Sequence, residues 1–424
     1  MPRVAFALSE IFVVSVRTDV FNGRPFAIAT YSDVLVRNAF ANCRQLLEEV
    51  TLNPAMGAYL NMLHNDKGDP KTGRRPNENY AREIMQLFSI GLHRLNLDGS
   101  LQLDANGFPI PTYDQRAVIG LAAAFTGWHF AQPGKRRWRG VPPDYRRPMM
   151  SVPEHHDRSA KTILDGVVLP ANQTPEQDLK QALDTIFKHP NVGPFFCRHL
   201  IQRLVTSNPS PGYIYRVASV FNNNGRGVRG DLAAVIRAIL TDYDARGEAK
   251  RTESAGHVRE PVLRLTALLR AFHASTPSGR FFIARPEPLG QAPLRSPTVF
   301  NFFSPDYQAP GAIAEKGLSS PELQITTETT AITSANFLRD AIFEHIGPPP
   351  NRMTLDFSKE EALAANPEQL VAHLDRLLLC SSMSAEMRRI LIDAITKIPE
   401  TERKERAKTA IYLIVISPEF AVEK

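Results

Sequence analysis

Cysteine is scarce in this sequence: the chain of 424 residues contains three, Cys43, Cys197 and Cys380, and they lie far apart. There is no Cys-x-x-Cys pair and no Cys/His spacing typical of zinc, which argues against a disulfide framework and against structural zinc. Cys197 follows two phenylalanines, so we interpret it as a small residue of the core.

Long apolar runs are also lacking. The longest near an end of the chain, 410–416, is far shorter than the roughly 20 residues that cross a bilayer, so we predict no membrane span. Residues 3–16 are largely apolar, but they lack the ordered regions and cleavage site of a signal peptide. We interpret them as a core helix that begins abruptly, as if an N-terminal part were missing.

Neither sign of charge dominates the composition. The 50 basic and 44 acidic residues give a formal net charge of +6 and a pI near 9.2. This balance fits a soluble protein as well as a weak binder of polyanions. The sequence contains no GxSxG elbow, no Walker loop, no HExxH and no GxGxxG after a strand, which argues against the commonest hydrolases, nucleotide-binding proteins and zinc proteases.

Signals for helices are numerous, whereas alternating strand patterns are few. The segments 174–177 and 366–369 each combine a capping residue with proline at the first helical position, and Thr112 and Ser358 each begin a further capping box. Together with the 33 prolines, these signals predict a mainly α fold, a large multi-helix orthogonal bundle with long Pro-rich ordered loops. The expected helices span residues 3–16, 33–50, 54–63, 77–95, 112–127, 174–188, 191–206, 211–223, 228–242, 259–274, 321–345, 358–364, 367–379, 384–397 and 400–416.

Two long stretches carry no helical pattern. One, 129–169, is rich in Pro and Arg, and the other, 275–320, is rich in Pro and Phe. Irregular segments of this length in a compact protein usually have a function. We therefore divide the chain into an N-terminal helical part (1–128), the Pro/Arg-rich loop (129–169) and a C-terminal helical part (170–424), which together form one continuous globular unit.

The segment 76–88 carries the first group of reactive side chains. Asn77 is a good helix cap, and Glu78 and Arg82 lie four residues apart on the side opposite the apolar stripe. Glu83 lies at the border of that stripe, so we expect it to be half buried. One interpretation is a surface ion pair plus a structural acid; the other is a cleft wall with a carboxylate tuned for acid–base or metal chemistry.

The second group is His155-His156-Asp157, followed by Lys161. Neighbouring His and Asp side chains on a loop could bind a metal or relay a proton. Adjacent residues seldom both face one ion, so a further ligand would have to come from elsewhere, and Glu83 is the candidate. The alternative is a loop held by hydrogen bonds and an ion pair between Asp157 and Lys161.

The most basic stretch lies inside the Pro/Arg-rich loop. Basic residues with interleaved aromatics can hold single-stranded nucleic acid, but no fold signature for nucleic-acid binding accompanies them. A solvated loop, or contact with an anionic polymer or partner, is the favoured interpretation. The residues concerned are Lys135, Arg136, Arg137, Trp138, Arg139, Tyr145, Arg146 and Arg147.

These segments, taken in order, resemble the bacterial Domain of Unknown Function 1800 family. The resemblance rests on residues 77–83, 125–128, 155–157 with Lys161, and 417–420, with later blocks at 259–261 and 296–305. It implies a bacterial protein, periplasmic or secreted, often exported through a twin-arginine signal. It also implies a genomic neighbour of the Domain of Unknown Function 1501 family, which is similar to sulfatases. It implies no activity, and so no catalytic residues.

Three functions remain open at this point. The first is an exported enzyme, hydrolytic or oxidative, with a divalent metal or iron bound by the His-His-Asp loop. The second is a non-catalytic envelope protein that binds or matures the sulfatase-like partner through the two long loops. The third, nucleic-acid binding, is the least favoured. The enzyme requires the acidic helix and the His-His-Asp loop to meet in one cavity; its residues would be Glu78, Arg82, Glu83, His155, His156, Asp157 and Lys161.

Overall fold

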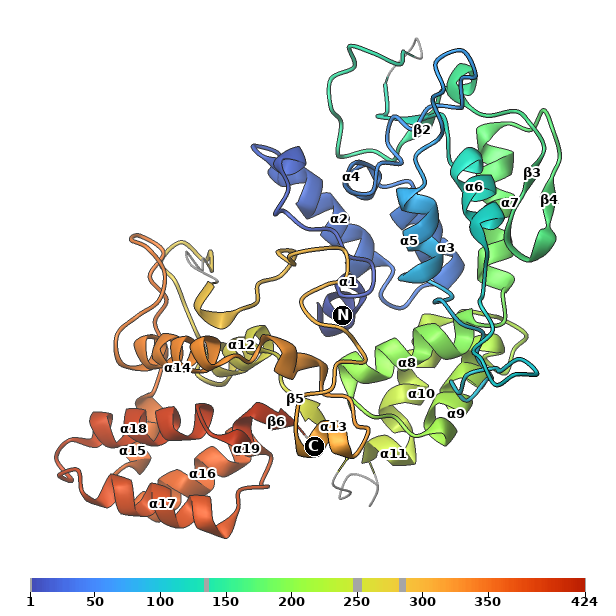
Figure 1. Cartoon of the computed structure of the whole chain (residues 1–424). Coiled ribbons are helices and arrows are strands. Elements are labelled where there is room, and N and C mark those ends of the chain that lie inside the picture. Colours follow the sequence, from blue (N-terminus) through green and yellow to red (C-terminus); the bar gives the residue numbers. More distant parts are fainter. Residues whose placement is uncertain (1, 133–136, 247–253, 282–286, 424) are drawn as a thin grey trace. The chain divides into compact units, whose positions relative to one another are not determined.

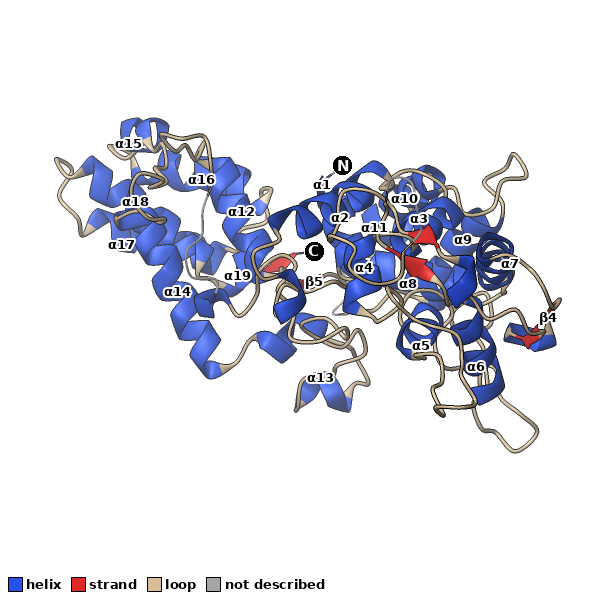
Figure 2. Ribbon diagram, turned by 90° about the horizontal axis from the view of Figure 1, so that it is seen from above, coloured by secondary structure: helices blue, strands red, loops and turns tan. Residues whose placement is uncertain are grey.

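The computed structural model describes residues 2–132, 137–246, 254–281 and 287–423. Within these ranges helices dominate and the strands form only short two-stranded pairs (Figures 1 and 2). The prediction of a mainly α, multi-helix fold with long irregular segments is confirmed. The chain divides into two compact units, Met1–Ala255 with Leu294–Asn301, and Gly256–Pro293 with Phe302–Lys424. The Pro/Arg-rich loop 129–169 therefore belongs to the first unit.

The first unit contains most of the predicted functional segments, and its helices surround one large apolar core. Two short antiparallel pairs, β1 (Trp128–His129) with β2 (Met150–Ser151) and β3 (Lys161–Thr162) with β4 (Val168–Leu169), lie within the Pro/Arg-rich loop. The helices are α1 (Pro2–Ser9), α2 (Pro25–Arg37), α3 (Cys43–Thr51), α4 (Pro54–Tyr59), α5 (Asn79–Gln86), α6 (Gln115–Ala124), α7 (Pro175–Lys188), α8 (Val192–Leu204), α9 (Pro211–Asn222), α10 (Leu232–Thr241) and α11 (Tyr243–Arg246).

The second unit has its own apolar core. Its strand pair joins β5 (His257–Val258) to β6 (Val422–Glu423). Its helices are α12 (Pro261–Ala271), α13 (Ala312–Glu315), α14 (Glu328–Phe343), α15 (Ser358–Leu363), α16 (Pro367–Leu379), α17 (Ala385–Thr396), α18 (Arg403–Val415) and α19 (Pro418–Ala421). In neither unit is any described helix both long and apolar enough to cross a bilayer.

The predicted helix caps are confirmed at two of four positions. Thr174 forms a reciprocal capping box with Gln177 at the start of α7, and the Asn366 side chain accepts from the Gln369 amide at the start of α16. The box predicted at Thr112 is wrong: α6 begins after Asp114, whose side chain accepts from the Ala117 amide. The box at 358 is also wrong, because Ser358 is already helical.

Several predicted helices are shorter or divided in the structure. The helix expected at 3–16 ends at Ser9 as α1, and the single helix expected at 33–50 is two helices, because Asn42 caps a new one, α3. The helix expected at 77–95 ends at Gln86. Gly91, with φ +71°, turns the chain there into a hairpin-like segment whose bridges include Leu95 with Leu101. Glycine adopts this backbone conformation without steric cost.

A close approach between α6 and β3 fixes the Pro/Arg-rich loop against the helices. A Cβ atom at Gly120 in α6 would lie 1.9 Å from the backbone oxygen of Thr162 in β3. Only glycine fits this contact, because the obstructing atom belongs to the backbone. Lys161, one residue before Thr162, is thereby held beside α6, and the next helix, α7, also packs against α6.

Candidate functional site

The start of α5 is held by a pair of asparagines. The Asn65 side chain accepts from the Asn77 amide at 2.7 Å and donates to the Asn77 carbonyl at 3.1 Å. The Asn77 side chain in turn accepts from the Asn79 amide at 2.9 Å. Together these bonds fix the direction in which α5 leaves the preceding loop, and with it the positions of the acidic side chains on that helix.

Glu78 and Arg82 form the predicted i,i+4 pair. The Arg82 guanidinium lies 2.8 Å from the Glu78 carboxylate, and the side chains are 40% and 34% exposed. Gln115, at the start of α6, donates to the same carboxylate oxygen at 2.9 Å. A pair this exposed contributes only a few tenths of a kcal/mol to stability. The interpretation of this pair as a surface ion pair is therefore confirmed.

Glu83 is in a different environment, although it is only one residue further along α5. It is 7% exposed, and so lies deeper than the half-buried position that we predicted, and its Oε2 atom is buried with no hydrogen-bond partner among the described residues. Burial raises the pKa of the Glu83 carboxyl, and the neighbouring Arg82 partly opposes this effect. Buried carboxylate oxygens are nearly always paired, so this unpaired one is a feature to explain.

Two tyrosines lie close enough to feel the charge of Glu83. Burial first, and the Glu83 carboxylate second, raise the pKa of Tyr59 to about 12. Burial also raises the pKa of Tyr113, with Arg82 opposing and Glu83 adding to the shift. Both phenols therefore keep their protons near neutral pH, and each can donate a hydrogen bond.

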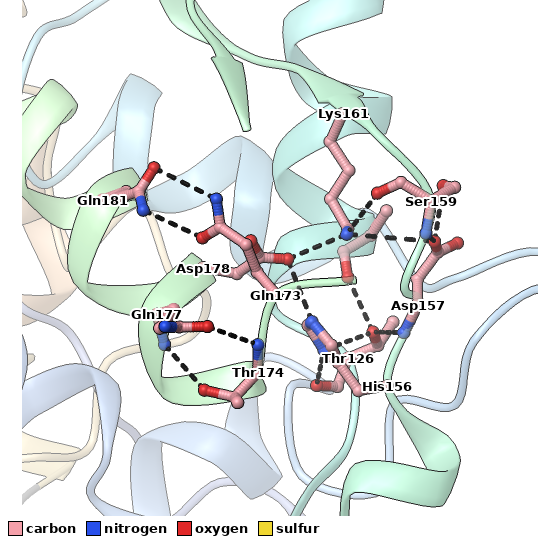
Figure 3. Close-up of polar contacts among 11 residues, drawn as sticks. Thr126, His156, Asp157, Ser159, Lys161, Gln173, Thr174, Gln177, Asp178 and Gln181 are labelled. Atoms are coloured by element: carbon pink, nitrogen blue, oxygen red, sulfur yellow. Dashed lines mark hydrogen bonds and ion pairs between the residues drawn. The ribbon is translucent and has the colours of Figure 1, made fainter. Parts of the chain in front are cut away.

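The imidazole of His156 is fully buried and is held at both nitrogens (Figure 3). Its Nε2 atom lies 2.9 Å from Oδ2 of Asp178 in α7, and its Nδ1 atom lies 3.0 Å from the Thr126 carbonyl oxygen. The Lys161 ammonium lies 2.8 Å from the same Asp178 oxygen and 3.9 Å from Asp157. We call His156, Asp157, Lys161 and Asp178 the buried charge cluster.

The hydrogen bonds determine the charge on His156. A carbonyl oxygen only accepts, so Nδ1 must donate to Thr126. The Thr126 hydroxyl donates to the Ala123 carbonyl at 2.6 Å, so it too is an acceptor toward the imidazole. Because Nε2 faces a carboxylate, these contacts predict that both ring nitrogens donate, as they do in an imidazolium. Two cations and two carboxylates then balance within the buried charge cluster.

His155 points to other partners. Its ring stacks on Trp138, with the ring centroids 4.0 Å apart and an interplanar angle of 6°, and its Nδ1 atom lies 3.0 Å from Asp66. Asp157 binds its own loop: its carboxylate accepts from the Ser159 amide at 2.8 Å and from the Ser159 hydroxyl at 2.6 Å. The three side chains predicted to bind a metal thus point to separate partners.

The described part of the chain contains no group of three or more His, Cys, Asp or Glu side chains placed to hold a metal ion. Because His155, His156 and Asp157 do not converge, these residues as arranged do not fit the divalent metal or iron that the sequence suggested. The function proposed below uses no metal. Lys161 and Asp157 do form part of one cluster, as the structural interpretation of this loop expected.

Two further histidines, His64 and His129, lie beside Trp138, which belongs to the basic stretch. The rings of His64 and His129 are 4.1 Å apart, and His129 is 5.5 Å from Trp138. Burial, and then the neighbouring His129, lower the pKa of His64 to about 4, and burial lowers the pKa of His129 as well. These rings are therefore neutral near pH 7. Lys135 and Arg136, named in the same stretch, lie outside the described residues.

The acidic helix and the His-His-Asp loop are linked through backbone and amide groups. Asn65, which holds Asn77, also accepts through its carbonyl from the Gly127 amide at 2.8 Å. A Cβ atom at Gly127 would lie 3.0 Å from the backbone and Cβ of His156, so glycine allows the close contact there. His156 is fully buried, and Glu83 is buried with 7% of its surface exposed.

Sequence reasoning missed Asp178. It lies on the inner face of α7 with Leu179, Ala182 and Ile186, and it is fully buried. The available signal was an acidic residue on the apolar stripe of a helix, because such a residue almost always has a charged partner. The partners themselves, Lys161 and His156, could not be read from spacing.

Fold and site together define a mainly helical protein of two compact units, the first of which contains a buried charge cluster and a buried, unpaired acid. The chain belongs to the family described as protein of unknown function (DUF1800), whose family model matches residues 1–422. No curated protein and no solved structure matches the chain.

Proposed function

We propose that the protein is an enzyme that uses Glu83 for general acid–base chemistry, in a hydrolytic reaction that needs no metal. One observation carries the proposal: a buried carboxyl group of unit 1 has an oxygen without a hydrogen-bond partner among the described residues, and its pKa is raised. Ionisable groups perturbed in this way concentrate at functional sites, because catalysis needs a proton that can be given and taken near neutral pH.

The surroundings of Glu83 suit a proton transfer. Arg82 pairs with the partly exposed carboxylate of Glu78, and its charge also acts on the buried carboxyl of Glu83. Unequal environments give neighbouring acids different roles. In its protonated form Glu83 would give its proton to the leaving oxygen of a C–O bond. As a carboxylate it would then take a proton from the attacking water. Tyr59 and Tyr113 would donate hydrogen bonds to the substrate.

The buried charge cluster supports this site indirectly. It ties the loop 155–161 to α6 and α7, and the Gly127–Asn65–Asn77 hydrogen bonds continue from there to the first turn of α5. In this proposal His155, His156, Asp157 and Lys161 position the acidic helix and do not touch the substrate. Oxidative chemistry is less well supported, because a lone acid moves protons and not electrons.

The test combines activity with a titration. Wild-type protein is offered a panel of chromogenic esters and glycosides, and Glu83→Gln should lower any hydrolysis by about a hundredfold or more. Glu154→Gln, which makes the same substitution at an exposed acid of unit 1, is the control and should leave the rate unchanged. A panel with no hydrolysed member, or full activity in Glu83→Gln, would contradict the proposal.

A pH series of stability provides a readout that does not need the substrate. A carboxyl whose folded pKa is raised stabilises the fold below its unfolded-state pKa of about 4.3, and this contribution is lost as the pH rises through the folded pKa. Glu83→Gln cannot ionise, so it should be more stable than wild type at pH 7 and should lose this advantage near pH 4. An advantage that did not change with pH would contradict the predicted ionisation of Glu83.

A second candidate function is the binding of a protein partner, such as the Domain of Unknown Function 1501 protein. The segment after α5 favours it, because Leu92, Leu101, Leu103 and Phe108 are between 46% and 67% exposed. Apolar side chains gathered at a surface mark interaction sites. Leu103→Ser with Phe108→Ser should abolish co-purification of the partner. Export of the protein to the periplasm or the medium remains part of both proposals.

A further inference from the structure

Unit 1 contains a cleft that the acid–base proposal does not use. Its volume is about 840 Å³, which lies within the range of sites that hold small ligands. One wall comes from residues 145–148 of the Pro/Arg-rich loop, and the others come from α2, α3 and the residues around the start of α4. Glu83 is not among its lining residues. The walls of the cleft are therefore formed by helices and by one loop.

The charges in this cleft cancel. Four arginines (Arg37, Arg44, Arg146 and Arg147) face four acids (Asp33, Glu48, Glu49 and Asp184). Arg37 lies 2.7 Å from Glu49, and Arg44 lies 2.7 Å from both Glu48 and Asp184. A cleft without net charge does not attract a polyanion or a cation strongly, because its positive and negative fields oppose each other at the distance of an approaching ligand.

Some polar side chains at the rim of the cleft remain available to bind a ligand. The Arg146 guanidinium lies 4.1 Å from the Phe26 ring centroid, and within the described ranges its side chain makes no hydrogen bond. Asp33 is exposed and likewise has no side-chain partner among the described residues. The side chain of Glu48 is 48% exposed beside Arg44. The cleft lining thus offers both a planar donor and carboxylate acceptors.

We call the apolar part of the cleft lining its floor. Val34, Leu52, Pro54, Tyr145 and Pro148 contribute to its lining. Tyr145 is held in place, because its hydroxyl accepts from Arg24 at 3.1 Å and its ring packs edge-on against Phe130 at 5.1 Å. A ligand with a flat apolar face and a polar edge would match this floor and this rim.

We propose that the cleft is a binding site for a neutral oligosaccharide. A sugar hydroxyl both donates and accepts, so one hydroxyl can bridge a guanidinium and a neighbouring carboxylate without separating an ion pair. The apolar face of a sugar ring would pack on the floor. An acidic glycan or a peptide of mixed charge would have to compete with the ion pairs that the cleft has already formed.

The experiment starts with the full chain on a glycan array that carries neutral and acidic glycans, followed by calorimetry with the best neutral oligosaccharide. The affinity should change by less than about twofold between about 0.05 and 0.5 M salt, because the ligand carries no charge to be screened. Arg146→Ala with Asp33→Ala should weaken binding by about tenfold or more. Arg226→Ala with Glu154→Ala, outside the lining, is the matched control and should bind like wild type.

Three results would overturn the proposal: no binding to any neutral glycan, binding that the Arg146/Asp33 variant does not weaken, or binding only of charged glycans or mixed-charge peptides with a steep loss in salt. The acid–base proposal is tested separately. Glu83→Gln should bind the oligosaccharide like wild type, so a failure at Glu83 and a failure of the cleft give different results.

Discussion

Removing the carboxylate at the centre of the buried charge cluster should destabilise unit 1 strongly. Asp178→Asn keeps the shape of the side chain but leaves the Lys161 ammonium and the His156 imidazolium buried without their shared partner. The two contacts are 2.8 and 2.9 Å long, and all three side chains are at most 2% exposed. A buried cation that loses its carboxylate partner destabilises the fold, because nothing then compensates for its lost hydration.

The expected magnitude follows from these distances. With an effective dielectric constant of about 20, a pair of charges at this separation is worth about 6 kcal/mol, and the cost of burying the carboxylate offsets much of it. Breaking a buried pair by removing one partner usually costs about 3–5 kcal/mol, and we expect a loss in that range. For a unit of this size the midpoint of thermal unfolding would fall by about 10 °C.

The assay is urea unfolding followed by tryptophan fluorescence. Trp128 and Trp138 are the two tryptophans of the chain, and both lie in unit 1, so the signal reports on that unit alone. Lys180→Gln, which removes a 72% exposed lysine from the same helix, is the matched control and should cost less than about 1 kcal/mol.

A double-mutant cycle distinguishes charge from packing. If the unpaired Lys161 ammonium causes most of the destabilisation, adding Lys161→Gln to Asp178→Asn should restore about 2 kcal/mol or more of the free energy of unfolding. A loss below about 1 kcal/mol for Asp178→Asn, or losses that simply add in the double variant, would refute the reasoning. Nitrogen NMR offers an independent check, because the predicted imidazolium requires a proton on both ring nitrogens of His156.

Two further predictions concern contacts that hold the same unit together. Gly120→Ala places a methyl group against the Thr162 backbone, so it should cost about 2–4 kcal/mol in the urea assay; a neutral result would mean that β3 can move away from α6. Asn191→Ala removes three hydrogen bonds of a buried side chain, to the carbonyls of Ile90 and His93 and from the Leu95 amide, and should cost about 3 kcal/mol. Hydrogen exchange at the Leu95 amide should accelerate with it, and unchanged protection would contradict this role.

Helix identity and local caps were predictable because their causes lie within a few residues. Thr174 with Gln177, and Asn366 with the amide of Gln369, needed no information from elsewhere in the chain. The burial of Glu83 followed from its position at the edge of an apolar stripe. Where two capping signals competed, spacing alone failed: Thr112 donates to the Gly91 carbonyl, and Asp114 caps α6 instead.

The sequence by itself determined the helical class, the family and which segments carry reactive side chains. Tertiary structure decided what those side chains do: it joined Lys161 and His156 to an unsuspected Asp178, turned His155 toward Trp138 and left one oxygen of Glu83 unpaired. The physical reason is the distance along the sequence between the residues that interact. A cap or a stripe depends on neighbours along one helix, whereas the partner of a buried charge depends on which elements pack together.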